Sequence, residues 1–345
     1  SEEIDMRFGL DDDQVEIQRT ATALLEARSS LERLRENAES NKDDDGLWAE
    51  LRELGWPGIA VSEEFGGQGY GLVELAVLLE QAGRTLAAVP LFSTAAAALA
   101  IESAGSDEQK ERWLPGLASG ESIGAVGTAI GGRSELAAGA PNAAVAVLFD
   151  EEGGARIVDL ADALVETVDT IDPTRRYGSV EGPGADMPGD TDAAFDRVIC
   201  ALAAELTGIA SRAMEITLAY VKERKQFGTP VGANQAIQHM CATMLLGTES
   251  ARSAAYHAAW AADASEEKLS EAAAVAHIAS VEAGRDVTSA AIQAHGGIGF
   301  TWEADPHWFF KRAQLNAQLL GGTGESRARL ADIVADHLAN GDLDD

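Results

Sequence analysis

The pattern of apolar residues changes twice along the chain, and this change limits the possible folds more than any other feature. In the first third, and again from Thr191, apolar residues recur every three or four positions, which is the spacing of amphipathic helices. Between these regions the apolar runs are short, as in Ala143–Phe149 and Ala155–Val158, and Gly, Pro, Asp and Thr separate them. Such runs are typical of strands and turns. The sequence therefore predicts a mostly α protein with a small β insert.

Three domains follow from this pattern. We expect an N-terminal helical domain over 1–120, a reduced middle β-domain over 121–189 and a C-terminal four-helix bundle over 190–345. The middle segment has about 70 residues, which is small for a unit that folds independently.

Caps and helix breakers place some of the helices. Asp11–Asp13 can cap a first helix, whose apolar positions continue to Leu31. A short helix is expected over Asp107–Leu114, ending before Pro115 because proline interrupts helical hydrogen bonding. From Thr191 onward the spacing predicts about four long helices.

Charge and composition exclude several classes of function. The formal net charge is −31, whereas nucleic acids and anionic membrane surfaces require a basic face, so neither is an expected partner. No stretch approaches the ~20 apolar residues of a membrane span and no basic, then apolar leader opens the sequence, so a cytoplasmic location is expected. The two cysteines, Cys200 and Cys241, form neither a disulfide framework nor a zinc pattern, and no metal site is expected.

Three stretches carry more specific information. The first is Glu223–Gly228, where a helix ends in basic residues and turns; by itself, it also fits a charged helix terminus. The second is Gln293–Phe300, whose adjacent glycines either end a helix or let backbone amides approach a ligand closely. The third combines Phe309–Arg312 with Leu320–Thr323. Each is weak alone, but their order and spacing together are specific.

Taken together, these stretches resemble the C-terminal domain of the acyl-CoA dehydrogenase family. The resemblance spans most of the chain and is strongest over Gly208–Thr323, while Trp56-Pro57 and Glu64–Gly67 are similar to an early turn of the family. It implies a helical domain, a β-domain and a four-helix C-terminal domain, assembled as a dimer or tetramer around FAD.

The resemblance also implies cofactor contacts. Arg224 matches an arginine that meets the FAD of the neighbouring subunit, and a guanidinium suits a pyrophosphate because it can form paired hydrogen bonds. Thr323 matches a hydroxyl near the flavin phosphates on the other side of the interface. The residues that match positions along the cofactor after this arginine are Gln226, Phe227, Val231 and Gln235, and those that match the turn at the adenosine end are Gln293, Gly296 and Gly297.

The chain departs from the family where the catalytic base belongs. The family's reaction requires a carboxylate beside the carbon that loses its proton. In many members this is a Glu directly before a Gly-Thr pair, and here that position is Gly321. Asp196 lies near the place where other members carry the Glu, although about two residues out of register, and Glu325 is a further candidate. The middle domain also lacks the Thr-Glu-Pro-Gly loop and the tryptophan-bearing strand that flank the flavin ring in relatives.

These departures lead to one main hypothesis. The chain resembles the short, base-lacking subunits of heterotetrameric acyl-CoA dehydrogenases of bacterial steroid side-chain degradation. It would contact the adenosine end of FAD, while a full-length partner supplies the flavin-ring pocket, the acyl-CoA site and the Glu, and an electron-acceptor flavoprotein reoxidises the complex. The alternatives are an autonomous dehydrogenase that uses Asp196 or Glu325, an oxidase or monooxygenase on a non-CoA substrate, and a structural partner that binds no cofactor.

Overall fold

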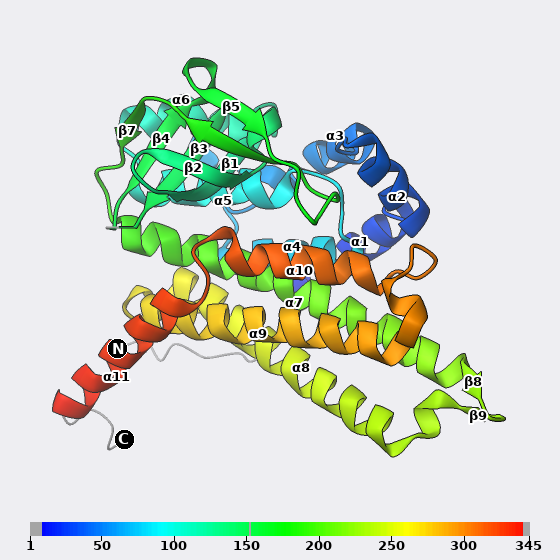
Figure 1. Cartoon of the computed structure of the whole chain (residues 1–345). Helices are drawn as coiled ribbons and strands as arrows, with labels where there is room; N and C mark the ends of the chain where they lie inside the picture. The colour runs from blue at the N-terminus through cyan, green and yellow to red at the C-terminus, as the bar shows by residue number, and fades with distance from the viewer. Residues whose placement is uncertain (1–8, 152, 341–345) are drawn as a thin grey trace.

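The computed structural model describes residues 9–151 and 153–340, and it shows a helical, β and helical arrangement (Figure 1). The first part contains six α-helices: α1 (Asp12–Arg28), α2 (Leu31–Ser40), α3 (Asp45–Glu53), α4 (Leu72–Thr85), α5 (Leu91–Ala104) and α6 (Asp107–Ala118). The expected cap at the start of α1 is confirmed, because the Asp11 side chain accepts a hydrogen bond from the Gln14 amide at 2.8 Å.

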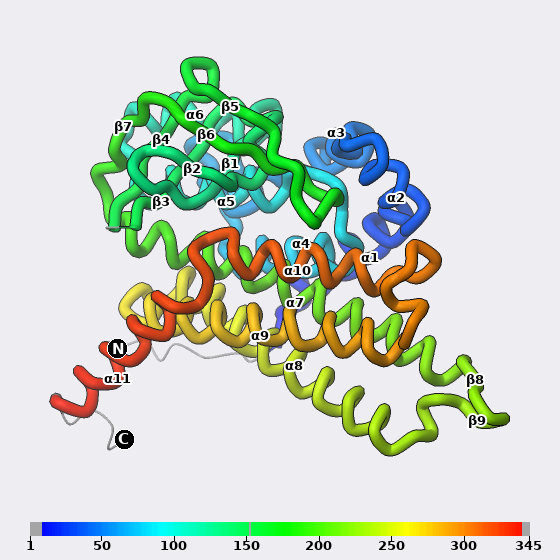
Figure 2. Tube along the Cα trace, viewed as in Figure 1, coloured from blue at the N-terminus to red at the C-terminus, as the bar shows by residue number. Residues whose placement is uncertain are grey.

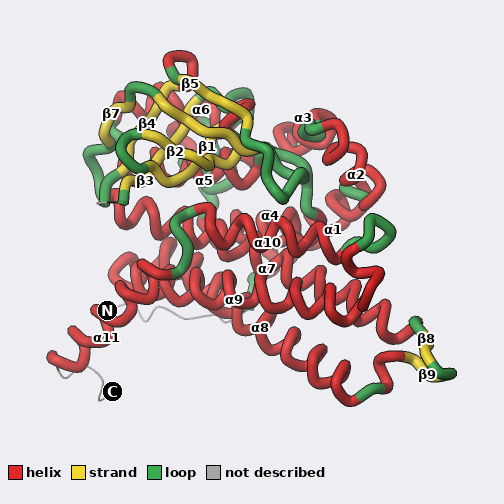
Figure 3. Tube along the Cα trace, viewed as in Figure 1, coloured by secondary structure: helices red, strands yellow, loops and turns green. Residues whose placement is uncertain are grey.

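The middle part is a seven-stranded sheet in the order β5-β6-β2-β1-β3-β4-β7. All neighbours pair antiparallel except β1 and β3, which run parallel. The strands are β1 (Gly124–Ala129), β2 (Arg133–Ala138), β3 (Val145–Asp150), β4 (Ala155–Asp159), β5 (Leu164–Thr167), β6 (Tyr177–Glu181) and β7 (Gly184–Asp186). Figure 3 shows the strands of this sheet gathered beside α5 and α6.

The C-terminal part is a helical bundle. Its helices are α7 (Thr191–Glu223), α8 (Gln235–Ala264), α9 (Leu269–His295), α10 (Pro306–Leu319) and α11 (Gly324–Asn340), with a two-stranded hairpin, β8 (Lys225–Gln226) and β9 (Thr229–Pro230), between α7 and α8. Glycine lets α4 cross α7 closely, because a Cβ on Gly208 would lie 1.9 Å from the Glu80 carbonyl oxygen. None of the described helices has the length and apolar character needed to cross a bilayer.

A buried polar network joins the sheet to the bundle. The Arg312 guanidinium of α10 is fully buried, where it pairs with Asp172 and lies 3.2 Å from a Glu205 carboxylate oxygen of α7. Arg175 pairs with the same Glu205, and Asn316 donates to it at 2.8 Å. Figure 2 shows the loop between β5 and β6, which carries Asp172, reaching toward α10. The sheet and the bundle therefore share a core of paired charges.

The predicted fold class is confirmed, with three local corrections. The first helix was expected to continue to Leu31, but α1 ends at Arg28 and α2 begins at Leu31 because Ser30 caps a new helix. The helix expected to stop before Pro115 continues to Ala118, since Pro115 lies on the exposed face where water can solvate the unpaired carbonyl. The described C-terminal residues hold five helices rather than four, because the segment around Phe309 folds as α10.

Candidate functional site

One end of the bundle collects most of the residues matched to cofactor contacts. Arg224 ends α7, and its carbonyl accepts a hydrogen bond from the Val231 amide at 2.8 Å, which closes the chain around the hairpin. Val231 is half-buried, whereas Arg224, Gln226 and Gln235 are exposed. These side chains are therefore presented to the surroundings from a fixed backbone.

The tip of the hairpin holds Phe227 away from the rest of the chain. Gln226 pairs with Thr229, so the loop consists of Phe227 and Gly228, and both have positive φ, 50° and 84°. Two left-handed residues form the tight turn that suits the twist of a hairpin. Positive φ is unfavourable for phenylalanine, and this ring is fully exposed. The turn therefore presents the Phe227 side chain to the surroundings.

The end of α9 joins this region through Tyr220 and His295. The two rings stack with centroids 4.2 Å apart, and the Tyr220 hydroxyl donates to the His295 carbonyl at 3.3 Å. His295 Nδ1 lies 2.7 Å from the Ala291 carbonyl oxygen, and burial lowers the pKa of this imidazole. This contact fixes the C-terminal end of α7, and therefore Arg224, beside the end of α9.

Directly after His295 the chain presents the predicted glycine turn. Gly296 has φ 65°, which favours glycine, and a Cβ at Gly296 or Gly297 would have no atom within 4 Å. Gln293 is exposed one turn earlier on α9. The structure thus brings Arg224, Phe227 and the Gln293–Gly297 turn to the same end of the bundle, as Figure 1 shows at the right.

Arg224 also stands out electrostatically. Among the described arginines, all except Arg224 and Arg285 form an ion pair with a carboxylate of the described chain. In a chain of 57 acidic residues, a free guanidinium is a group available to an external anion.

Thr323 and Gly321 lie at the other end of α10. This helix has 14 residues and is about 21 Å long, and it separates them from the Gly296–Gly297 turn. Gly321 has φ 83° and borders a cavity of about 160 Å³ between the sheet and the bundle, which Glu325 and Asp192 also line. Pockets for small molecules usually have about 300–1,000 Å³, so this cavity is too small for a flavin ring and a thioester. The structure does not bring Thr323 together with Arg224.

The two candidate bases differ in their surroundings. The Asp196 carboxylate is buried and pairs with Arg329 of α11, and it does not line the cavity beside Gly321. Burial raises the pKa of Asp196 to about 6, although the Arg329 guanidinium opposes this shift. Glu325 is exposed at the first turn of α11 and lines the cavity. Asp196 therefore acts as an ion-pair partner in this chain.

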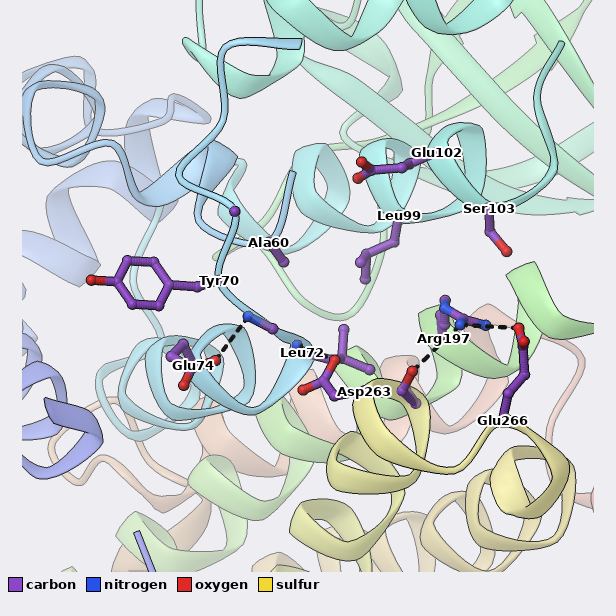
Figure 4. A pocket seen from close by; sticks show the side chains of 13 residues that line it. Ala60, Tyr70, Leu72, Glu74, Leu99, Glu102, Ser103, Arg197, Asp263 and Glu266 are labelled. Carbon is purple, nitrogen blue, oxygen red and sulfur yellow. Dashed lines mark hydrogen bonds and ion pairs between the residues drawn. The ribbon is translucent and has the colours of Figure 1, made fainter. Parts of the chain in front are cut away.

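A cavity of about 700 Å³ bordered by α4, α5 and α8 offers no separate site (Figure 4). Its carboxylates already hold the fold together. Asp263 accepts from the Leu72 amide at 2.8 Å and so caps α4, Glu102 accepts from the Ser62 amide at 3.0 Å, and Glu266 pairs with Arg197 at 3.3 Å. The cavity is acidic and its carboxylates are engaged, which does not suit an anionic cofactor.

Comparison with known proteins shows the family of this chain. A model of the acyl-CoA dehydrogenase N-terminal domain matches residues 11–121, and a model of the acyl-CoA dehydrogenase C-terminal domain matches 193–338. The chain is 36% identical to the acyl-CoA dehydrogenase IpdE2 of Mycolicibacterium smegmatis over 316 residues, which cover 91% of this chain and 96% of that protein. It therefore belongs to the acyl-CoA dehydrogenase family.

Two solved structures share the whole fold. A chain of the Tcur3481-Tcur3483 steroid ACAD has a TM-score of 0.85 and 30% identity, covering 95% of this chain and 99% of that chain. A chain of the ChsE4-ChsE5 complex from Mycobacterium tuberculosis also has a TM-score of 0.85, at 24% identity, covering 96% and 99%. The latter likeness shows the fold alone.

Two features of this region were not predicted from the sequence. One is the contact between the two cofactor motifs, and the other is an aromatic cluster beyond them. Tyr220 and His295 are 75 positions apart, so only the packed structure reveals their stacking. The cluster contains Trp302, His307 and Trp308, whose rings lie 4.5–5.3 Å apart. The signal in the sequence was a density of aromatic residues over 300–310.

Proposed function

We propose that this chain is the base-lacking subunit of a two-chain acyl-CoA dehydrogenase, in which it holds the adenosine end of FAD for a full-length partner. The observation that carries the proposal is Arg224, a fixed arginine without a carboxylate partner in the described chain. It lies at the bundle end that also presents Phe227 and the open Gly296–Gly297 turn.

The residues at this end fit the nucleotide half of FAD. The Arg224 guanidinium would grip the pyrophosphate through charge-assisted hydrogen bonds. The Gly296–Gly297 turn would let the sugar and base approach the backbone, with Gln293 as a hydrogen-bonding side chain and Phe227 as an apolar surface. The strong negative charge of the whole chain makes these few groups decisive, since the overall field opposes an anion.

The residues at the other end of α10 do not fit the flavin ring. Gly321 offers no carboxylate, and the cavity beside it has about 160 Å³. The proton acceptor and the flavin-ring pocket would therefore come from the partner. FAD supplies the acceptor for the hydride that leaves the β carbon of the acyl thioester, while the partner's carboxylate takes the proton from the α carbon. This chain would bind and orient the cofactor.

The substrate class follows from the relatives. One structural neighbour is named a steroid ACAD, so we propose that the complex acts on a steroid side chain carried as a CoA thioester. Two structural neighbours are complexes named for two components, which supports a heteromeric assembly here. An electron-acceptor flavoprotein would then reoxidise the complex.

The proposal predicts that Arg224→Ala weakens FAD binding in the co-expressed complex. Loss of charge-assisted hydrogen bonds of about 1.5–3 kcal/mol corresponds to a roughly ten- to hundredfold higher Kd for FAD. Arg224→Lys should give an intermediate Kd, because the charge remains but the paired donors are lost. The measurement is flavin fluorescence during titration of the apo-complex with FAD.

Arg19→Ala is the matched control, since Arg19 is an exposed arginine of α1 that pairs only with Glu16 in the described chain. Its complex should bind FAD as the wild-type complex does. Wild-type affinity in the Arg224→Ala complex would refute the proposal, and it would favour a structural partner without cofactor contacts.

A further inference from the structure

An aromatic cavity of about 250 Å³ lies at the start of α10, beside the cofactor residues already described but not lined by them. Its walls come from the turn after η7 (Gly296–Phe300), from the first half of α10 and from the loop between β5 and β6. The lining residues are Ile171, Phe300, Trp302, His307, Phe310 and Lys311.

The rim of this cavity is unusually apolar for an outer surface. Phe300 is 74% exposed, Trp302 66% and Ile171 54%, and all three border the same hollow. Exposed apolar side chains that occur singly are ordinary, whereas a cluster around a concavity marks a site of association. Tryptophan, the residue type at position 302, is among those enriched at the centre of protein interfaces.

Hydrogen-bonding groups at the floor of the cavity lack partners. His307 is 4% exposed, and neither ring nitrogen has a hydrogen-bond partner among the described residues. Burial lowers the pKa of His307 to about 4, so the imidazole is neutral at pH 7 and offers one donor and one acceptor. The indole N–H of Trp308, which packs on His307, is likewise buried without a partner. Such groups are normally satisfied in a native structure.

Lys311 adds a positive charge. Its Nζ lies 4.5 Å from the centroid of the Trp302 ring and 5.2 Å from that of Trp308, and it forms no ion pair with a carboxylate of the described chain. The cavity therefore combines an apolar rim, an unsatisfied imidazole and a free ammonium group. This chemistry suits a protein segment that brings an apolar side chain and a hydrogen-bonding or acidic group together.

The position of the cavity identifies the segment's source. Phe300 follows the Gly296–Gly297 turn within the same short helix, η7, so a partner whose FAD reaches this turn would lie beside the rim. A free small molecule fits less well, because small-molecule pockets usually have about 300–1,000 Å³.

We propose that this aromatic cavity is the docking site of the full-length partner subunit. This inference rests on the two-chain function proposed above. The partner inserts one apolar side chain between Trp302, Phe300 and Ile171, and an acidic group beside it pairs with Lys311. This contact is distinct from the cofactor grip at Arg224, and it would hold the two chains together even without FAD.

The test uses this chain co-expressed with a candidate full-length acyl-CoA dehydrogenase partner. Trp302→Ala should raise the Kd of the complex at least tenfold, measured by mass photometry on dilution, while circular dichroism and the melting temperature of the separate chain remain unchanged. Tyr70→Ala is the matched control, because Tyr70 is a half-exposed aromatic side chain of the N-terminal part and should leave this Kd unaltered. A photo-cross-linking amino acid in place of Phe310 should cross-link to the partner.

The outcomes separate this inference from the proposed function. Three results would each refute the proposed docking site. They are wild-type association of the Trp302→Ala variant, failure of the two wild-type chains to associate, and cross-linking at position 310 to a second copy of this chain. If Trp302→Ala weakens assembly while Arg224→Ala leaves FAD affinity unchanged, the docking site is supported and the cofactor role is refuted. If Arg224→Ala weakens FAD binding while Trp302→Ala leaves assembly unchanged, the cofactor role is supported and the docking site is refuted.

Discussion

Asp196 shows how a single buried charge ties the last helix to the rest of the chain. Its carboxylate is 3% exposed and pairs with Arg329 of α11, which also lies 3.4 Å from the Ser270 hydroxyl. A second contact, 2.8 Å between His277 Nδ1 and the Ser326 hydroxyl, fixes the start of the same helix. Burial lowers the pKa of His277 to about 4, so this imidazole is neutral at pH 7.

Asp196→Asn should change how stability depends on pH. Burial raises the pKa of Asp196 to about 6, so the folded chain retains this proton at a pH where the unfolded chain, with a pKa near 4, has lost it. The stabilisation from this group is complete below pH 4 and is lost as the pH rises through 6. Relative to Asp196→Asn, the wild type should therefore lose about 3 kcal/mol of unfolding free energy between pH 4 and pH 7.

Urea denaturation of both chains at several pH values measures this difference, and the other titrating groups cancel in the comparison. A difference that stays constant over this range would show that Asp196 is ionised throughout.

At the scale of elements, α10 connects the sheet to the bundle through Arg312. Its guanidinium is buried with Asp172 and Glu205, so removing it leaves two carboxylates with fewer counter-charges. Arg312→Met should lower the unfolding free energy by about 3–5 kcal/mol, as measured by urea denaturation at pH 7. Arg19→Met on exposed α1 should change it by less than about 0.5 kcal/mol. Equal losses in the two variants would mean that the network contributes no more than a surface ion pair.

The same helix shows what the sequence could not reveal. Pro306 at its start and Gly321-Gly322 after its end are ordinary helix boundaries, yet the inward positions include Arg312 and Asn316. These polar residues interrupt the apolar stripe, so periodicity alone did not indicate a helix. Their burial depends on Asp172 and Glu205, which are more than 100 positions away.

Other elements were predictable because their signals are local. The Asp11 cap confirmed the start of α1, and the short apolar runs correctly indicated β3 and β4. Part of the candidate site was predictable as well, since the glycines at 296 and 297 mark a turn at the end of a helix. The Tyr220–His295 stacking and the aromatic cavity depend on distant segments meeting, and neither leaves a local pattern.

On the scale of the whole molecule, the two ends of α10 have different character. One end presents a free arginine, whose backbone is anchored by hydrogen bonds, together with an exposed phenylalanine and an open glycine turn. The other end has Gly321 where the family's base belongs, beside a cavity of about 160 Å³. The proposed function assigns half of a flavin site to this chain and requires a second chain for the other half.

The amount of FAD per chain tests this requirement most directly. The absorbance of released flavin should be measured for the purified chain alone and for its complex with the full-length partner. We expect the chain alone to retain no FAD and to oxidise no acyl-CoA. We expect the active complex to contain one FAD for each pair of unlike chains. One FAD per chain in a homo-oligomer that oxidises an acyl-CoA would contradict it.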